Sequence, residues 1–202
     1  MNNCRRNLEK NLPYGTYRQG PLRRILISIT RNLPENWLGL RLMFLLRRIA
    51  TIGISKKVDT ELFGFPMRLY SQGNVSEKRA LFAPQFFDPQ ERQIIASLAA
   101  DNSVFIDIGA NMGLYSFSTA AAFKAYKNTR IIAVEPHPII SDRLAYNLSL
   151  NPELPIKQIT IGLGGRDGLE TMISPTSNLG ESRLLKKNED PKGKSYEIQI
   201  TT

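Results

Sequence analysis

Two carboxylates flank a glycine-rich turn in the middle of the chain. In the stretch VFIDIGANMGLYSFS (104–118), Asp107 comes two residues before Gly109, and Gly113 follows four residues later. The next apolar run, RIIAVEP, ends in Glu135. Glycines leave the backbone uncovered, so a ligand can approach the main chain and the amides at the start of the following helix. A carboxylate at the end of the second run is placed to accept both hydroxyls of a ribose, so the pattern predicts a nucleoside site.

The segments around this turn must position the two acids. SVFIDIG is a short, nearly continuous apolar run, which is typical of a strand buried on both faces. LYSFSTAAAFKAY has a helical pattern, and RIIAVEP is a second buried strand. Strand, turn, helix, strand is the first half of a nucleotide-binding βαβ unit, in which a right-handed crossover sets the strands side by side. The predicted fold class is α/β, a Rossmann-like sheet with helices on both faces.

The turn departs from the dinucleotide fingerprint. G-x-G-x-x-G would require glycine in place of Asn111 and glycine or alanine in place of Leu114. Asp107 repels a pyrophosphate but favours a cationic ligand. S-adenosylmethionine carries a sulfonium and an ammonium group and no phosphate, so it suits this turn better than a dinucleotide. The alternative is a glycine-containing strand-to-helix turn that binds no ligand.

Four segments resemble the FkbM family of S-adenosylmethionine-dependent methyltransferases. They are FIDIGANMGLYSF, AVEPHPIISDRLAYNLSLN, ITIGLGGRDGLETM and NLGESRL, and their order and spacing also match. The resemblance runs from about Ser76 to the C-terminus. It implies a class I methyltransferase sheet, S-adenosyl-L-methionine as cofactor, and O-methylation of a hydroxyl on a sugar or small molecule, so that the partner is a small-molecule or glycan acceptor.

The resemblance also assigns roles to individual residues. Glu135 would hold the ribose hydroxyls and Pro136 would shape the adenine end. His137, the only histidine, is expected to pack near adenine or face solvent rather than act as a base. No catalytic residue is predicted. By the same resemblance, the methionine and ribose side of the cofactor is lined by Asp107, Gly109, Ala110, Asn111 and Gly113.

The C-terminal part of the chain leads to a prediction about completeness. SYEIQITT (195–202) has a strand pattern. In the family, a helix and a fourth parallel strand follow, and that strand lies beside the strand at 104–108. We therefore expect a sheet that is incomplete after the third core strand. One interpretation is a shortened methyltransferase, and the other is a truncated, inactive remnant that at most binds nucleotide or associates with a membrane or partner. The loop SNLGES (177–182) matches a family loop near the substrate entrance, but such loops are also common turns.

The excess positive charge lies entirely at the N-terminus. Residues 1–60 hold 12 lysines and arginines against three acids, and the remaining residues are neutral overall. We therefore divide the chain into a basic helical segment (1–60) and the Rossmann-like domain (61–202). Pro34 should separate two helices capped at Asn32 or Asn36.

The basic segment has two interpretations that the sequence leaves open. It either packs on the catalytic domain with its arginines in water, or rests on an anionic membrane surface. Nucleic acid is not expected as a partner, because aromatic and basic residues do not alternate and no binding module is recognised.

Composition limits the remaining possibilities. One cysteine, Cys4, and one histidine cannot form a disulfide framework or a Cys/His metal cluster, so no metal site is predicted. The sequence has no recognisable signal peptide. We expect a cytoplasmic protein, either free or at the inner face of the membrane.

Overall fold

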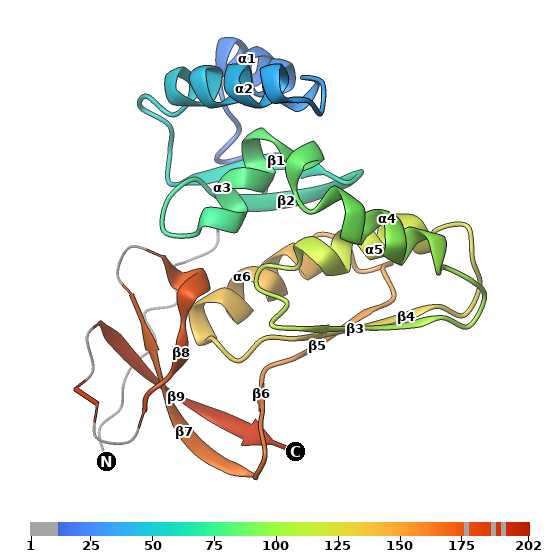
Figure 1. The fold of residues 1–202 in the computed structure, drawn as a ribbon, viewed down its shortest axis with the longest axis vertical. Helices are drawn as coiled ribbons and strands as arrows, with labels where there is room; N and C mark the ends of the chain where they lie inside the picture. Colours follow the sequence, from blue (N-terminus) through green and yellow to red (C-terminus); the bar gives the residue numbers. More distant parts are fainter. Residues whose placement is uncertain (1–11, 176–177, 187–188, 191–192) are drawn as a thin grey trace.

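The computed structural model describes residues 12–175, 178–186, 189–190 and 193–202. Helices and short sheets follow one another along the elongated molecule, with the N-terminal helices at one end and the C-terminal strands at the other (Figure 1). Cys4 lies outside the described residues.

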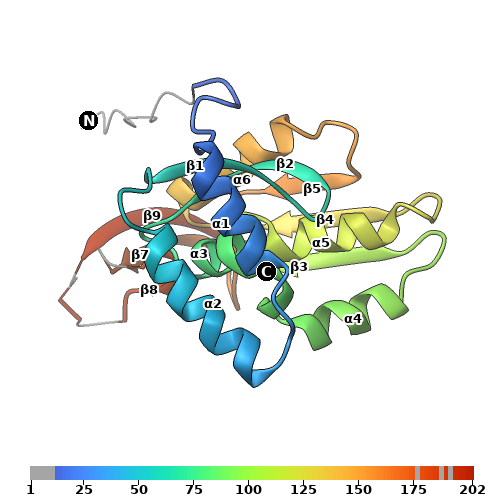
Figure 2. The ribbon, with the colours of Figure 1, turned by 90° about the horizontal axis from the view of Figure 1, so that it is seen from above.

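Two helices form a layer at one end of the molecule (Figures 1 and 2). They are α1 (Pro21–Arg31) and α2 (Trp37–Ala50), and they pack side by side. Between them lies Pro34, whose ring cannot continue a helix. The side chain of Asn36 caps α2 by accepting the amide of Gly39 at 2.8 Å. The predicted division at Pro34 is therefore confirmed, with Asn36 as the cap.

A hairpin connects this layer to the rest of the chain. It consists of β1 (Lys57–Leu62) and β2 (Phe65–Tyr70), which pair antiparallel, and it is followed by α3 (Val75–Phe82). A buried ion pair ties the hairpin together, with Arg68 Nε 2.6 Å from Asp59 Oδ1. The Asp59 carboxylate also accepts two backbone amides from the segment before α1. This pair therefore anchors the N-terminal segment to the hairpin.

The central sheet is parallel and has the order β3–β4–β5. Its strands are β3 (Val104–Ile108), β4 (Arg130–Val134) and β5 (Ile156–Ile159). The crossover helices α5 (Leu114–Phe123) and α6 (Pro138–Ser149) lie on one side of these strands (Figure 1). The predicted α/β fold, with parallel strands joined by crossover helices, is confirmed, but in the described part of the chain both crossover helices lie on the same side of these strands and not on both faces as predicted.

Among the described strands, β3 lies at the edge of this sheet and pairs with β4 alone. The side chains of Val104, Ile106 and Ile108 are 47%, 55% and 66% exposed. The prediction that this strand is buried on both faces is therefore wrong, because only the alternate residues point at the helices. Helix α4 (Pro89–Ser97) packs beside α5.

The C-terminal strands form a separate mixed sheet with the order β6–β9–β7–β8. They are β6 (Gly162–Leu163), β7 (Gly168–Ser174), β8 (Arg183–Leu184) and β9 (Lys194–Thr201). Strand β9, which matches the predicted strand SYEIQITT, runs parallel to β6 and antiparallel to β7. The small core of this sheet consists of Met172, Ile198 and Ile200.

The main hydrophobic core continues from the helical layer into the central sheet. It includes Ile27 and Ala50 of the N-terminal helices as well as Phe117 and Leu144 of α5 and α6. The predicted domain boundary at residue 60 falls inside β1. Within the described part of the chain, every helix is too short or too polar to cross a bilayer.

Candidate nucleoside site

The glycine turn lies at the carboxyl ends of β3 and β4, where open parallel sheets bind their ligands. Ile108 pairs in register with Val134, and the next two amides, of Gly109 and Ala110, both donate to the Val134 carbonyl at 2.9 and 3.0 Å. Asn111 has a φ of 53°. The chain thus folds back over the end of β4 before α5 begins.

The two glycines of the turn have different surroundings. Gly109 has a φ of 75°, and a Cβ added there would meet no atom within 4 Å. Gly113 has a φ of 97°, and a Cβ there would lie 2.8 Å from the Leu144 side chain and 2.9 Å from the Phe117 ring. Gly109 therefore leaves open space beside the backbone, and its predicted contact with the cofactor stays a prediction. Gly113 instead allows α5 to pack closely on α6 and its own first turn.

Glu135 closes the turn from the neighbouring strand. Its Oε2 accepts the amide of Asn111 and its Oε1 accepts the amide of His137, both at 2.8 Å. The side chain is buried, and burial raises the pKa of Glu135. The bonds from the two amides lower the pKa, and the nearby negative charge of Asp107 raises it. Each carboxylate oxygen still has lone-pair capacity beyond the amide it accepts. The acid can thus hold the turn and accept further hydroxyl donors.

Asp107 points at the start of α5. Its Oδ2 accepts the amide of Ser116 at 3.0 Å and the hydroxyl of the same residue at 2.6 Å. Burial raises the pKa of Asp107, and the two bonds from Ser116 oppose that rise. The carboxylate therefore positions the first turn of α5. Its predicted contact with the cofactor stays a prediction.

The backbone amides of the turn all bond within the protein. Those of Gly109 and Ala110 donate to Val134, that of Asn111 donates to Glu135, and that of Gly113 donates to the carbonyl of Ala110. The amide at position 112 donates to the Asn111 side chain. The amides of residues 109–113 are therefore not free for a ligand, whereas the predicted approach of a ligand to the amides at the start of α5 stays a prediction. A phosphate needs such donors, so residues 109–113 are unsuited to a pyrophosphate.

A cluster of asparagines beside the turn was missed by sequence reasoning. Asn74 donates from Nδ2 to Asn111 Oδ1 at 2.8 Å and also caps α3. Asn178 accepts the amides of Val75 and Gly180, and it lies in the loop predicted as a possible substrate entrance. The loop therefore lies against the turn. Asn74 was recognisable as a helix cap, but its contact across 37 residues was not.

His137 is buried and caps the start of α6. It is 1% exposed, its Nδ1 accepts the amide of Ile139 at the start of α6, and its Nε2 lies 2.8 Å from Ser174 Oγ on β7. Burial lowers the pKa of His137 to about 4. His137 was expected to pack near adenine or to face solvent, and its burial shows that it does not face solvent. Burial also keeps the ring from reaching a substrate proton. Pro136, just before it, is half-buried.

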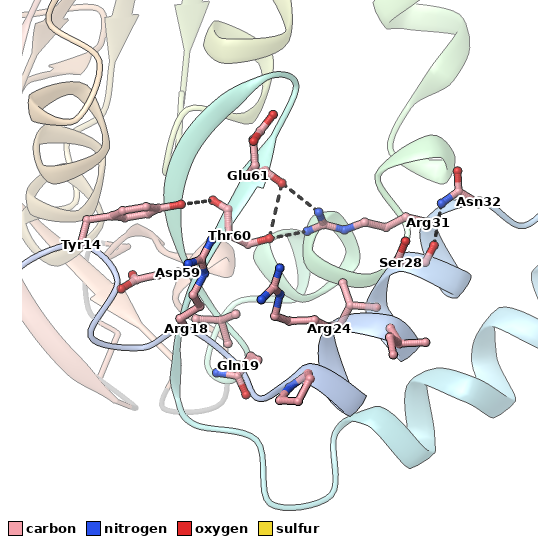
Figure 3. Close-up of a pocket in the computed structure, with 14 residues that line it drawn as sticks. Tyr14, Arg18, Gln19, Arg24, Ser28, Arg31, Asn32, Asp59, Thr60 and Glu61 are labelled. Carbon is pink, nitrogen blue, oxygen red and sulfur yellow. Dashed lines mark hydrogen bonds between the residues drawn. The ribbon is translucent and has the colours of Figure 1, made fainter.

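A hollow of about 610 Å³ lies elsewhere, between α1 and β1 (Figure 3). Its walls carry Arg18, Arg24 and Arg31, whose side chains point toward the same stretch of β1 around Thr60. It shares no residue with the glycine turn. Although it is a large cavity, the paired carboxylates and the open space beside Gly109 are the features that suit a nucleoside, so we place the candidate cofactor site at the turn.

Comparison with known proteins gives partial matches. The chain is 34% identical over 107 residues to methyltransferase sdnD of Sordaria araneosa, which covers 52% of this chain and 39% of that protein. The chain thus spans about two fifths of the length of this curated relative. No family model matches. The predicted membership of the FkbM family therefore stays a prediction.

Solved structures give weak matches. P. horikoshii TYW2 in complex with MeSAdo matches with a TM-score of 0.40 and 18% identity, covering 77% of this chain and 61% of that one. The M. jannaschii tRNA m1G37 methyltransferase matches with a TM-score of 0.38 and 21% identity, covering 52% and 30%. The second of these is named for a nucleic-acid substrate. The prediction that excludes nucleic acid as a partner is therefore wrong as an exclusion.

Proposed function

We propose that this chain is a methyltransferase that uses S-adenosyl-L-methionine, of the FkbM type, and methylates a hydroxyl of a sugar or small molecule. The likeness to methyltransferase sdnD supports the reaction class. Because the chain spans about 39% of that relative, the activity of the whole protein is part of the proposal.

The observation that carries the proposal is the closed turn between two acids. Every amide from residue 109 to residue 113 already has an acceptor inside the protein. Asp107 and Glu135 add negative charge at the same place. A ligand there gains nothing from phosphate groups, and a cation is favoured. An adenosyl group that carries positive charge and no phosphate meets both conditions.

The residues present fit such a cofactor. Glu135 has lone pairs left for the two ribose hydroxyls, and Gly109 leaves the backbone open beside it. Asp107 supplies negative charge at the entrance to the turn, and Pro136 follows the acid where the adenine would lie. When bound, the cofactor supplies an electrophilic methyl group on a sulfonium. The described residues position it, and His137 is excluded as the base because its ring is buried.

Isothermal titration calorimetry of the full chain with S-adenosylmethionine and with NAD tests the cofactor class. We expect heat of binding with the first ligand only. Glu135→Gln should weaken that binding by about 10- to 100-fold, because a charged acceptor of hydroxyl hydrogen bonds is replaced by a neutral one. Glu153→Gln, at an exposed glutamate away from the turn, is the matched control and should bind normally. Binding of NAD instead, or equal affinity of the Glu135 variant, would contradict the proposal.

The acceptor is tested separately with a methyl-labelled donor. The full chain is incubated with a pool of sugars and hydroxylated small molecules and, in parallel, with transfer RNA. Label in the first pool supports the proposed acceptor class. Label only in RNA replaces that class with nucleic acid, and calorimetric binding without any transfer refutes the proposed activity while leaving the cofactor assignment intact.

A further inference from the structure

The N-terminal helix pair packs inward with one side and leaves a large apolar surface on the other. On α1, the residues that face the protein are Ile27 and Thr30, while Leu22, Ile25 and Ile29 are 72%, 56% and 45% exposed. These three recur at helical spacing, so they form one stripe. The interpretation in which the segment packs on the domain thus accounts for only half of α1.

Helix α2 repeats this arrangement. Leu38, Leu42, Leu45 and Ile49 follow one another at intervals of four, three and four residues and are 66%, 40%, 59% and 50% exposed. The buried side of the helix uses other residues, namely Gly39, Met43 and Ala50. We call the two exposed stripes together the outer face. A soluble monomer rarely exposes so continuous an apolar surface, so the outer face needs an occupant.

The charges around the outer face indicate what kind of surface it can bind. Residues 21–52 contain six arginines and one acid, Glu35. Arg41 lies 4.4 Å from the centre of the Trp37 ring, which is itself 66% exposed. Arg47 lies 4.8 Å from the centre of the Phe44 ring. Apolar side chains flanked by aromatic rings and arginines are the composition of a helix that lies in the headgroup region of a membrane.

The hollow beside α1 is lined by further cationic groups, from α1 and from the segment before it (Figure 3). Arg24 lines it together with Arg18, and in the described part of the chain neither side chain takes part in an ion pair. Arg31, deeper in, donates to the carbonyls of Leu81 and Glu61. Guanidinium groups without a carboxylate partner, at the flank of an apolar surface, are placed to meet phosphate groups.

We propose that the outer face of the α1–α2 pair binds the surface of an anionic phospholipid bilayer. The helices lie side by side at one end of the molecule, so one bilayer surface can reach both of them (Figure 2). Both helices are too short to cross a bilayer, which limits the contact to its surface. This proposal does not depend on the identity of the cofactor.

Other occupants fit the outer face less well. A second copy of the chain would bring the same arginines opposite one another, and like charges across an interface cost binding energy. A nucleic acid would satisfy the arginines but would leave the leucines and isoleucines of both stripes against a polar backbone. An anionic bilayer satisfies the charges and buries the apolar side chains at the same time.

Co-sedimentation of the full chain with vesicles tests the proposal. We expect binding to equimolar phosphatidylcholine and phosphatidylglycerol at low salt, and much weaker binding to phosphatidylcholine alone. Leu38→Ser with Leu45→Ser should lower the partition coefficient at least tenfold, since both side chains are exposed in the free protein and buried on the bilayer. Arg41→Gln with Arg48→Gln should lower it about thirtyfold.

A matched control uses exposed apolar residues elsewhere. Ile94→Ser with Leu98→Ser changes side chains that are 59% and 73% exposed near α4 and should leave vesicle binding unchanged. Circular dichroism and thermal unfolding verify that all variants fold like the wild type.

Three results would overturn the proposal. The first is no binding to the anionic vesicles. The second is an effect of the arginine pair without an effect of the leucine pair, together with tight binding of an RNA oligonucleotide, which would indicate nucleic acid. The third is self-association in analytical ultracentrifugation that the leucine pair abolishes, which would indicate a second copy.

Discussion

Replacing His137 by asparagine should change how the stability of the protein depends on pH. The ring is buried against Ser174 and Tyr196, and burial lowers its pKa from 6.5 to about 4. In the unfolded chain the imidazole takes up its proton near its ordinary pKa, so between pH 6.5 and 4 the unfolded state binds more protons than the folded state. The free energy of unfolding therefore falls as the pH falls through this window, by about 3 kcal/mol in total.

Asparagine is the informative substitute because it retains the helix cap. Its side-chain oxygen can accept the amides at the start of α6 that His137 Nδ1 accepts now, but it does not titrate. The assay is urea unfolding of wild type and His137→Asn at several pH values from 7.5 to 4.5. We expect the difference in unfolding free energy between the two proteins to shift by about 2.5 kcal/mol over that range, in favour of the variant at low pH.

The assay compares the unfolding free energy of the variant with that of wild type, because another buried group changes stability with pH in the opposite direction. Burial raises the pKa of Glu77 to about 7 and outweighs the attraction of Arg143, so its contribution to stability falls as the pH rises. This contribution is common to both proteins and cancels. Ser174→Ala serves as control, since it removes the hydrogen bond but no titrating group. A difference that stays constant with pH would refute the neutral, buried state of His137.

Three further predictions concern stability, each measured by urea unfolding. Glu77→Gln should make the stability rise more steeply with pH between pH 4.5 and 7, because it removes a contribution through which wild type loses about 3 kcal/mol relative to the variant and leaves the opposite contribution of His137; an unchanged slope would exclude Glu77 as its source. Arg68→Met should cost about 3–5 kcal/mol, because it leaves the buried Asp59 carboxylate without its cation, and a loss below 1 kcal/mol would mean that the pair is hydrated. Gly113→Ala should cost about 3 kcal/mol through backbone strain and close contacts, whereas Gly109→Ala should cost about 1 kcal/mol from strain alone; equal losses would contradict the different surroundings of the two glycines.

The local pattern of the sequence was sufficient for the elements that form the site. Apolar runs and glycines predicted β3, the turn, α5 and β4, because each depends on residues close together in the chain. Asn36 could be recognised as the cap of α2 for the same reason. The position of Glu135 at the end of a strand also followed, since parallel strands end at one edge of the sheet.

The contacts of the site could not be predicted, because they join residues far apart in sequence. Glu135 binds the amide of Asn111 across 24 residues, and Asn178 accepts the amide of Val75 across 103. The exposure of β3 was also missed, since an apolar run has the same composition whether one of its faces is covered or not. His137 looked accessible beside two prolines, and only its contact with Ser174 at the end of β7 shows that it is enclosed.

The closed state of the turn has a consequence for selectivity. Because Val134 and Glu135 already hold its amides, the turn keeps its shape without a ligand, and a ligand that binds there need not order it. The same bonds remove the donors on which phosphate recognition depends. A single carboxylate thus fixes the backbone with one lone pair on each oxygen and retains the others for hydroxyl groups. Rejection of dinucleotides and acceptance of an adenosyl cation would then have one structural cause, the inward direction of the amides between the two acids.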